Sequence, residues 1–170
     1  MYPGVIFVSQ QQPGNPPPSL QPTHVVTCLL MRFDEREPRL LLVRRSSRVG
    51  SYHGRWAGVS GFVEIDATPE EQAYTEIREE TGLQREQVRM LKRGVVVEHI
   101  DAELRRHFYI HPFLFEVLTP NAIRIDWEAT EMHWVAPSQL LNYETVPKHE
   151  TVPKLPEVYE SAVNGEEVIS

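Results

Sequence analysis

The sequence predicts an α/β domain whose mixed β-sheet carries helices on its faces. Runs rich in leucine and β-branched residues at 24–33, 39–46, 87–99 and 106–117 indicate strands. One strongly bounded helix lies between them, and the order of elements does not repeat a regular βαβ unit. The 170 residues, 41% of them hydrophobic, suit one domain with its own core.

The first 22 residues differ in composition from the rest of the chain. Residues 10–22 contain five prolines and no charged residue, which favours an extended arm. We therefore predict an N-terminal segment and Pro-rich arm over 1–22, and one domain with C-terminal helical pieces over 23–170. The apolar run Val5–Val8 before the arm is a candidate contact with a second subunit, which would give a homodimer.

The domain begins with a predicted hairpin of buried strands, 24–33 and 39–46, joined by a polar segment that contains a proline. The next stretch, 48–61, is glycine-rich and is predicted to be irregular. After the helix, two long strands at 87–99 and 106–117 flank the polar turn 101–105. The predicted elements that end the chain are a short strand at 133–137 and helical pieces at 137–143 and 153–163.

Charge and composition exclude several classes of function. The net charge is −7, and an acidic chain lacks the basic phosphate contacts of nonspecific nucleic-acid binding. No apolar run approaches the roughly 18 residues of a membrane span. The first residues also lack the basic region and the long apolar region of a secretory signal peptide. The single cysteine, Cys28, lies in an apolar strand and is expected to be an inert core residue. We expect a cytoplasmic protein with neither nucleic-acid nor membrane partners.

The helix has clear boundaries at both ends. Thr68 is a good N-cap, Pro69 suits the first helical position, and Glu71 completes a capping box. Gly82 is free to take the left-handed conformation that ends a helix. We therefore predict a helix between Thr68 and Gly82.

Three glutamates gather on one side of this helix. Glu76, Glu79 and Glu80 stand at positions i, i+3 and i+4, within an arc of roughly 100°. Carboxylates this close repel one another unless solvent or a cation compensates. A solvated acidic face is one reading. Because the cluster adjoins a glycine-rich loop, and because clustered carboxylate oxygens suit Mg²⁺ or Mn²⁺, a metal site is the other.

The same region resembles a known family. Gly61, followed after fourteen residues by Glu76-Ile77-Arg78-Glu79-Glu80-Thr81-Gly82-Leu83, is similar to the Nudix box, in which a glycine, five residues, a glutamate and seven residues precede R-E-U-x-E-E-x-G-U (U, bulky aliphatic). Seven of the nine constrained positions match, and the flanking strands extend the resemblance over about 23–142. The resemblance implies a Nudix-type α/β/α sandwich.

Two positions depart from this pattern. Ala67 stands where the family has its first glutamate, and Thr75 where it has its arginine. In the family that arginine helps to orient the metal-binding glutamates. With both residues replaced, the protein could bind metal more weakly or carry out altered chemistry. It could also be a non-catalytic, nucleotide-sensing Nudix module.

The resemblance implies a metal-dependent hydrolase of a phosphoanhydride bond, acting on a nucleoside diphosphate linked to another moiety or a similar small phosphorylated compound. Glu76, Glu79, Glu80 and the Gly61 carbonyl would bind Mg²⁺ or Mn²⁺. Metal ions neutralise charge on a reacting diphosphate, and a carboxylate then accepts the proton of the attacking water. In the family that base is a box glutamate or one on a later loop. Glu76 or Glu79 is our first choice, and Glu98 and Glu103 are the alternatives.

Further residues are candidates for substrate binding. Arg44, Arg45, Arg48 and Arg55 precede the box and are either phosphate ligands or surface charge, and Trp56 is either a stacking platform or core. We predict Arg44, Arg45, Arg55 and Trp56 as substrate-binding residues. Spacing does not favour a zinc site among His99, His107 and His111, although one of them can line the substrate cleft. The repeated ETVPK at 144–148 and 150–154 is a surface-loop duplication or a loop that closes on an anion through Lys148 or Lys154.

Overall fold

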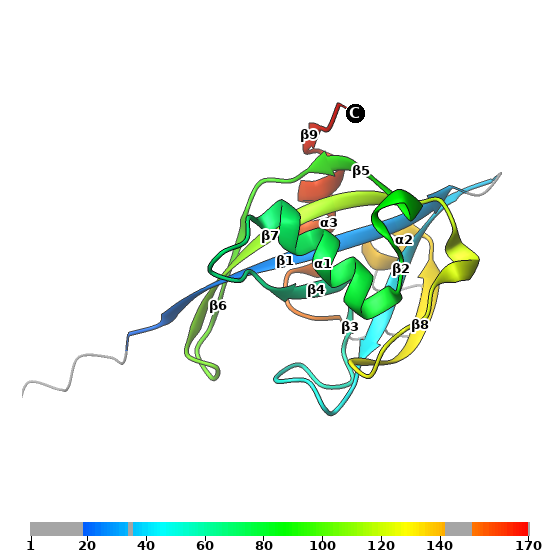
Figure 1. Cartoon of the computed structure of the whole chain (residues 1–170). Coiled ribbons are helices and arrows are strands. Elements are labelled where there is room, and N and C mark those ends of the chain that lie inside the picture. The colour runs from blue at the N-terminus through cyan, green and yellow to red at the C-terminus, as the bar shows by residue number, and fades with distance from the viewer. Residues whose placement is uncertain (1–18, 34–35, 142–150, 170) are drawn as a thin grey trace, which may run out of the picture.

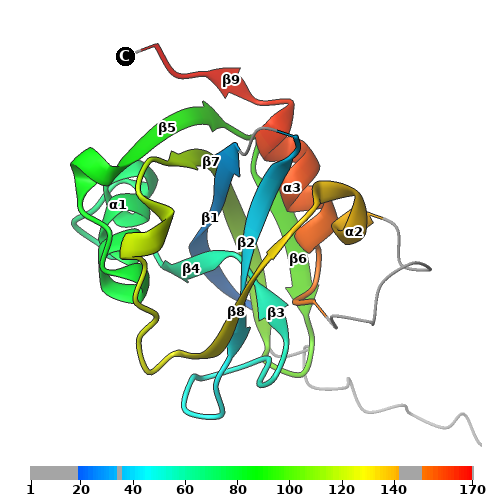
Figure 2. The ribbon, with the colours of Figure 1, turned by 90° about the vertical axis from the view of Figure 1, so that its right-hand side faces the viewer.

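The computed structural model describes residues 19–33, 36–141 and 151–169. They form three layers, with helix α1 (Pro69–Thr81) on one face of a sheet and helix α3 (Leu155–Val163) on the other (Figures 1 and 2). A short helix α2 (Pro137–Leu141) and two 3₁₀ turns, Arg85–Gln87 and Pro120–Ala122, complete the helical elements of the described part. The predicted α/β/α sandwich with a mixed β-sheet is confirmed.

Within the described residues, nine strands form one mixed sheet. Central strand β1 runs parallel to β7 over eleven residue pairs, from Gln21↔Arg106 to Met31↔Glu116, and antiparallel to β2 and β4. The remaining pairings are antiparallel: β2 with β3 and β8, β7 with β5 and β6, and β5 with β9. The strands are β1 (Gln21–Phe33), β2 (Pro38–Arg45), β3 (Trp56–Ala57), β4 (Val59–Phe62), β5 (Val88–Arg93), β6 (Val97–Asp101), β7 (Arg106–Val117), β8 (Ala129–Val135) and β9 (Glu166–Glu167).

The core fills both sides of the sheet because successive strand residues point to opposite faces. On the α1 side, Val26, Cys28 and Leu30 of β1 pack with Ile77 of the helix. On the other side, Leu29 and Met31 belong to a second cluster that includes α3. This double burial explains the uninterrupted apolar run at 28–31 of β1. Cys28 is fully buried, as expected, and its thiol donates to the Ala73 carbonyl at 3.6 Å.

The predicted hairpin of 24–33 and 39–46 is confirmed by the antiparallel β1–β2 pairing. The single strand predicted at 87–99 is wrong, because the chain breaks at Gly94 into β5 and β6. Gly94 packs so closely on α3 that an added Cβ would lie 2.7 Å from the Ser161 hydroxyl. The irregular stretch 48–61 contains β3 and the start of β4, which the sequence did not predict.

Several predicted features lie wholly or partly outside the described residues. These are most of the N-terminal arm, the apolar run Val5–Val8, and the first copy of the repeat. In the second copy, Lys154 lies 3.8 Å from Glu157 of α3. No helix of the described residues is long and apolar enough to cross a membrane.

Candidate active site

Helix α1 holds the glutamates in a fixed frame. The Thr68 side chain accepts from the Glu71 amide at 3.2 Å, and the Glu71 carboxylate accepts from the Thr68 amide at 2.9 Å, so the predicted capping box is present. Gly82 ends the helix at φ 74°. Glu76 and Glu80 are buried, each 8% exposed, whereas Glu79 is exposed to solvent.

Gly61 lies directly against this helix. The Glu76 carboxyl group fills the space where a side chain at Gly61 would stand, so an added Cβ would overlap it. Only glycine permits this approach of β4 to α1, and the approach places the Gly61 backbone beside the Glu76 carboxylate. The structure thus brings together the two parts of the box that the sequence separates by fourteen residues.

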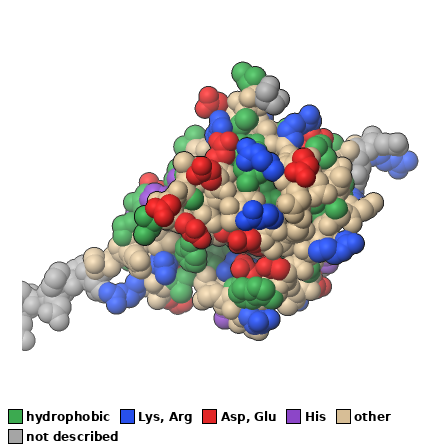
Figure 3. Space-filling view, in the orientation of Figure 1, with side chains coloured by type: hydrophobic (Ala, Val, Ile, Leu, Met, Phe, Trp, Pro, Cys, Tyr) green, Lys and Arg blue, Asp and Glu red, His purple; other side chains and the backbone are tan. Residues whose placement is uncertain are grey.

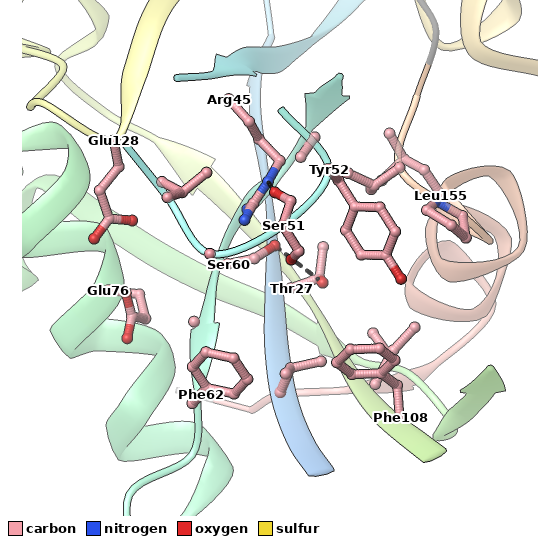
Figure 4. Close-up of a pocket in the computed structure, with 18 of the residues that line it drawn as sticks. Thr27, Arg45, Ser51, Tyr52, Ser60, Phe62, Glu76, Phe108, Glu128 and Leu155 are labelled. Carbon is pink, nitrogen blue, oxygen red and sulfur yellow. Dashed lines mark hydrogen bonds between the residues drawn. The ribbon is translucent and has the colours of Figure 1, made fainter. Parts of the chain in front are cut away.

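A later segment adds carboxylates that sequence reasoning missed. The Arg124 amide donates to the Thr81 carbonyl at 2.8 Å and the Asp126 amide to the Glu80 carbonyl at 3.3 Å, so this segment is fastened to the end of α1. Glu128 follows. Its amide donates to the Asp126 carboxylate at 3.0 Å, and its carbonyl accepts from the Ser46 amide at 2.8 Å. Glu128 is therefore held near Glu76, on the same side of the site (Figure 4).

Burial and mutual repulsion shift the acidity of these groups. Burial, with the neighbouring Glu79 and Glu128 charges, raises the pKa of Glu76 to about 7, despite an opposing hydrogen bond from Gln72. Burial and the charges of Glu128, Glu76 and Asp126 raise the pKa of Glu80. Burial also raises the pKa of Glu128. Groups that resist ionisation in this way gain from a positive charge placed among them.

Arg45 supplies one positive charge at this point. Burial lowers the pKa of its guanidinium, while the Glu80 and Glu128 carboxylates oppose that shift. Its Nε donates to the Ser51 carbonyl at 2.9 Å, which fixes the side chain beneath the loop that follows β2. Of the adjacent Arg44 and Arg45, strand alternation turns Arg45 toward the glutamates. Arg48, a further candidate arginine, also lies close by, with its guanidinium 5.2 Å from the centre of the Trp127 ring.

A cavity of about 410 Å³ connects these residues to the far side of the sheet. At one end are Glu64, Glu76, Glu79 and Glu128, on the face where acidic side chains gather around α1 (Figure 3). At the other end the lining is largely apolar, and Figure 4 shows Tyr52, Phe108 and Leu155 there, opposite Glu76 and Glu128. We call these the carboxylate end and the apolar end. Arg45, Ser51, Ser60 and Thr27 lie between them.

Three predicted substrate residues do not reach this cavity. Arg44 points to the other side of β2 from Arg45, and its Nη1 lies 3.0 Å from the Glu131 carboxylate. Trp56 is 7% exposed and packs in the core beside His133, at 4.5 Å between ring centroids. Arg55, which precedes it, is exposed and does not line the cavity either. These residues are close in sequence, but neighbouring residues of β2 point to opposite faces and a turn separates β2 from β3. Closeness in sequence therefore did not indicate which of them reach the cavity.

The alternative bases also lie elsewhere. The carboxylate of Glu98, on β6, lies 2.8 Å from His107 Nε2 at the sheet surface. Glu103 is exposed in the β6–β7 turn. Neither lines the cavity. His107 and His111 share a face of β7, as their parity predicted, whereas His99 is the histidine that lines the cavity. In the second copy of the repeat, Val152 and Pro153 line it too.

The donor set fits a hard divalent cation. The carboxylate end offers glutamate oxygens and the backbone of Gly61, the ligand type that Mg²⁺ and Mn²⁺ prefer. Among the residues that the structure describes, no three His, Cys, Asp or Glu side chains are already arranged as a ligand cage. The fit therefore rests on donor chemistry and on the raised pKa values of the crowded carboxylates.

Comparison with known proteins decides the family. The family model described as the NUDIX domain matches residues 22–155. The chain belongs to the Nudix family. The family places it among the Nudix-type pyrophosphohydrolases, which act on acid anhydrides, and so accounts for the glutamate-rich helix at the cavity.

Solved structures share the Nudix fold at low sequence identity. An Ap4A hydrolase from C. elegans, in a binary complex, is 13% identical, with a TM-score of 0.67 over 82% of this chain and 93% of that one. A MutT protein from Methanosarcina mazei Go1 is 22% identical, with a TM-score of 0.63 over 83% and 92%. A bifunctional NMN adenylyltransferase/ADP ribose pyrophosphatase from Francisella tularensis is 20% identical, with a TM-score of 0.63 over 84% of this chain and 41% of that one.

Proposed function

We propose that this Nudix protein hydrolyses, with Mg²⁺ or Mn²⁺, the phosphoanhydride bond of a nucleoside diphosphate linked to another moiety or of a similar compound. The observation that carries the proposal is the meeting of α1 carboxylates and Glu128 at one end of a cavity, with the Arg45 guanidinium beside them. The Francisella tularensis relative is described as complexed with AMP and a manganese ion. That description supports both the cation and the nucleotide.

Glu76, Glu79, Glu80 and the Gly61 carbonyl would hold the cation. When bound, it supplies neutralisation of phosphate charge and activation of water for attack. Arg45 donates to the non-bridging phosphate oxygens, where its planar guanidinium matches a phosphate. A carboxylate that faces the cavity then accepts the proton of the attacking water. Glu76 and Glu79 are joined in this role by Glu128, which replaces Glu98 and Glu103 as the later-loop candidate.

The apolar end supports a substrate with an organic group beyond the diphosphate. Phe108, Ile110 and Val158 form a small cluster there, against which Val25 of β1 packs. These side chains bury the face of an uncharged ring and offer nothing to a further phosphate. We therefore place the nucleoside of the substrate at this end.

The test compares Mg²⁺-dependent phosphate-bond cleavage across nucleotide sugars, dinucleoside polyphosphates and nucleoside triphosphates. Glu79→Gln and Glu80→Gln should each lower kcat by about 10²–10⁴-fold, the range for loss of a catalytic carboxylate, with the melting temperature retained. Glu86→Gln, at an exposed position outside the cavity, is the matched control. Turnover unchanged in both site variants would reject the assignment.

A non-catalytic, nucleotide-sensing module is the second candidate, and Ala67 and Thr75 favour it. Thr75 Oγ1 donates to the Glu71 carbonyl at 3.2 Å and so is occupied within its own helix. Nucleotide binding without metal-stimulated turnover would establish this alternative. Restoring Ala67→Glu together with Thr75→Arg would then raise turnover if the native site is impaired.

The proposal extends to the setting of the protein. We propose a cytoplasmic enzyme that acts on a small phosphorylated molecule, without a nucleic-acid or membrane partner. The acidic side chains around the cavity support this, because they repel a polyanion that brings no cation. A homodimer through the segment before residue 19 remains part of the proposal. Light scattering of the full chain and of a chain that begins at residue 19 tests it.

A further inference from the structure

Glu76 is oriented by a glutamine that the box pattern does not include. Gln72 stands one turn before it on α1, and its side chain is 3% exposed. The Gln72 Nε2 atom donates to Glu76 Oε1 at 2.8 Å. A buried amide with no partner would be destabilising, so this contact fixes both side chains.

The other end of the same amide holds the loop that leads into the helix. The Glu64 amide donates to Gln72 Oε1 at 3.2 Å. Turning the amide by 180° would set its oxygen against the Glu76 carboxylate and its NH₂ against the Glu64 N–H. Both contacts would then repel, so the orientation of Gln72 is determined by its surroundings.

These bonds restrict the Glu76 carboxylate from two sides. Gly61 of β4 contacts it on one side, where even a methyl group would overlap, and Gln72 binds it on the other. The neighbouring Thr75 does not orient Glu76, because its hydroxyl donates a hydrogen bond to the Glu71 carbonyl on a different side of the helix.

We propose that Gln72 is the positioning residue of this site: it holds the Glu76 carboxylate toward the cavity and ties it to the loop at Glu64. The inference rests on the proposed function, in which Glu76 binds the cation. Groups that hydrogen-bond a metal ligand set its direction, and their loss typically weakens metal affinity or activity about 10–100-fold.

Gln72→Met tests this role, because methionine has a similar length and flexibility without the amide. In calorimetric titration of the substrate-free protein, Mn²⁺ should bind about 10–100-fold more weakly than to the wild type. The Mg²⁺ concentration for half-maximal turnover should rise in parallel, while KM for substrate at saturating Mg²⁺ stays within about twofold. Gln139→Met is the matched control, because it also removes a glutamine bond to a backbone amide, that of Ala136, away from the cavity.

A merely structural role predicts a different result. Gln72→Met would then lower the melting temperature without changing the Mn²⁺ dissociation constant, and that outcome overturns the inference. If the methionine variant does not fold, Gln72→Asn replaces it, since the shorter amide keeps the polarity but cannot reach both partners. A wild-type chain that takes up no Mn²⁺ and shows no metal-stimulated turnover would instead reject the proposed function, which separates the two failures.

Discussion

The two ends of the cavity are built in different ways. The carboxylate end depends on hydrogen bonds and charge: a capped helix, a glycine that admits Glu76, and a segment fastened to the helix terminus. The apolar end depends on packing between β7, α3 and residues 152–153. The difference indicates that the reaction and the binding of substrate depend on separate parts of the cavity. Substitutions at the carboxylate end should therefore change kcat, and substitutions at the apolar end should change KM.

The largest expected effect is at Glu128 of the carboxylate end. Glu128→Gln keeps the shape and removes the charge that faces Glu76 and Glu80. If Glu128 accepts the proton of the attacking water, kcat should fall about 10²–10⁴-fold. Steady-state kinetics at saturating Mg²⁺ measure this.

Glu98→Gln is the companion variant, because Glu98 lies on the sheet surface beside His107. It should leave kcat within about twofold of the wild type. A loss at Glu98 with none at Glu128 would restore the sequence-based alternative and remove Glu128 from the mechanism.

A smaller effect is expected at Tyr52, which borders the apolar end. Its hydroxyl donates to the Asp101 carboxylate at 2.6 Å and so links the loop after β2 to the β6–β7 hairpin. Tyr52→Phe removes one hydrogen bond, worth roughly 0.5–1.5 kcal/mol, so KM should rise about 2–10-fold with kcat unchanged. Tyr109→Phe, on the opposite face of the sheet, is the control. A fall in kcat alone would contradict the separation of the two ends.

The last effect concerns stability and pH rather than turnover. Because the folded pKa of Glu76 is about 7, above its ordinary value of 4.5, the folded chain binds more protons than the unfolded chain in this interval. Unfolding then releases protons, and stability falls as pH rises from about 4.5 to about 7. Without metal, the melting temperature should therefore decrease over this range by several degrees, about 2–4 °C per kcal/mol for a domain of this size.

Two further scans show how much of this slope comes from Glu76. Glu76→Gln should make the slope shallower, because one titrating group is gone, while Glu80 and Glu128, whose pKa values are also raised, still contribute. Mg²⁺ should raise the melting temperature more at pH 8 than at pH 5, because a ligand that favours the ionised carboxylates stabilises the folded state. A slope that is the same in Glu76→Gln would assign the dependence to other groups.

Local patterns predicted the helix of the carboxylate end well. Thr68, Pro69 and Gly82 act within one helix, so the sequence alone determines its boundaries and the placing of its glutamates. Glu128 could not be predicted in this way. Its position depends on hydrogen bonds from a distant segment to Thr81 and Glu80, which leave no spacing signal in the sequence.

The predicted arginines show the same limit. Arg44 and Arg45 are adjacent and chemically alike, and only the pleat of β2 sends one to Glu131 and the other toward the cavity. The pattern of leucines and valines predicted the strand, but both of its faces are buried, so hydropathy did not distinguish them. Trp56 was ambiguous for a related reason, since core packing and stacking use the same side chain.

The parallel pairing of β1 with β7 joins residues that are 85 positions apart. Closing so long a loop is entropically unfavourable until the pairing is formed, which places the completion of the sheet late in folding. A nascent chain that ends just after α1 contains the whole box but lacks β7, the strand that pairs with β1. Catalytic competence should therefore appear only after most of the polypeptide has been synthesised, making turnover a direct report of finished folding.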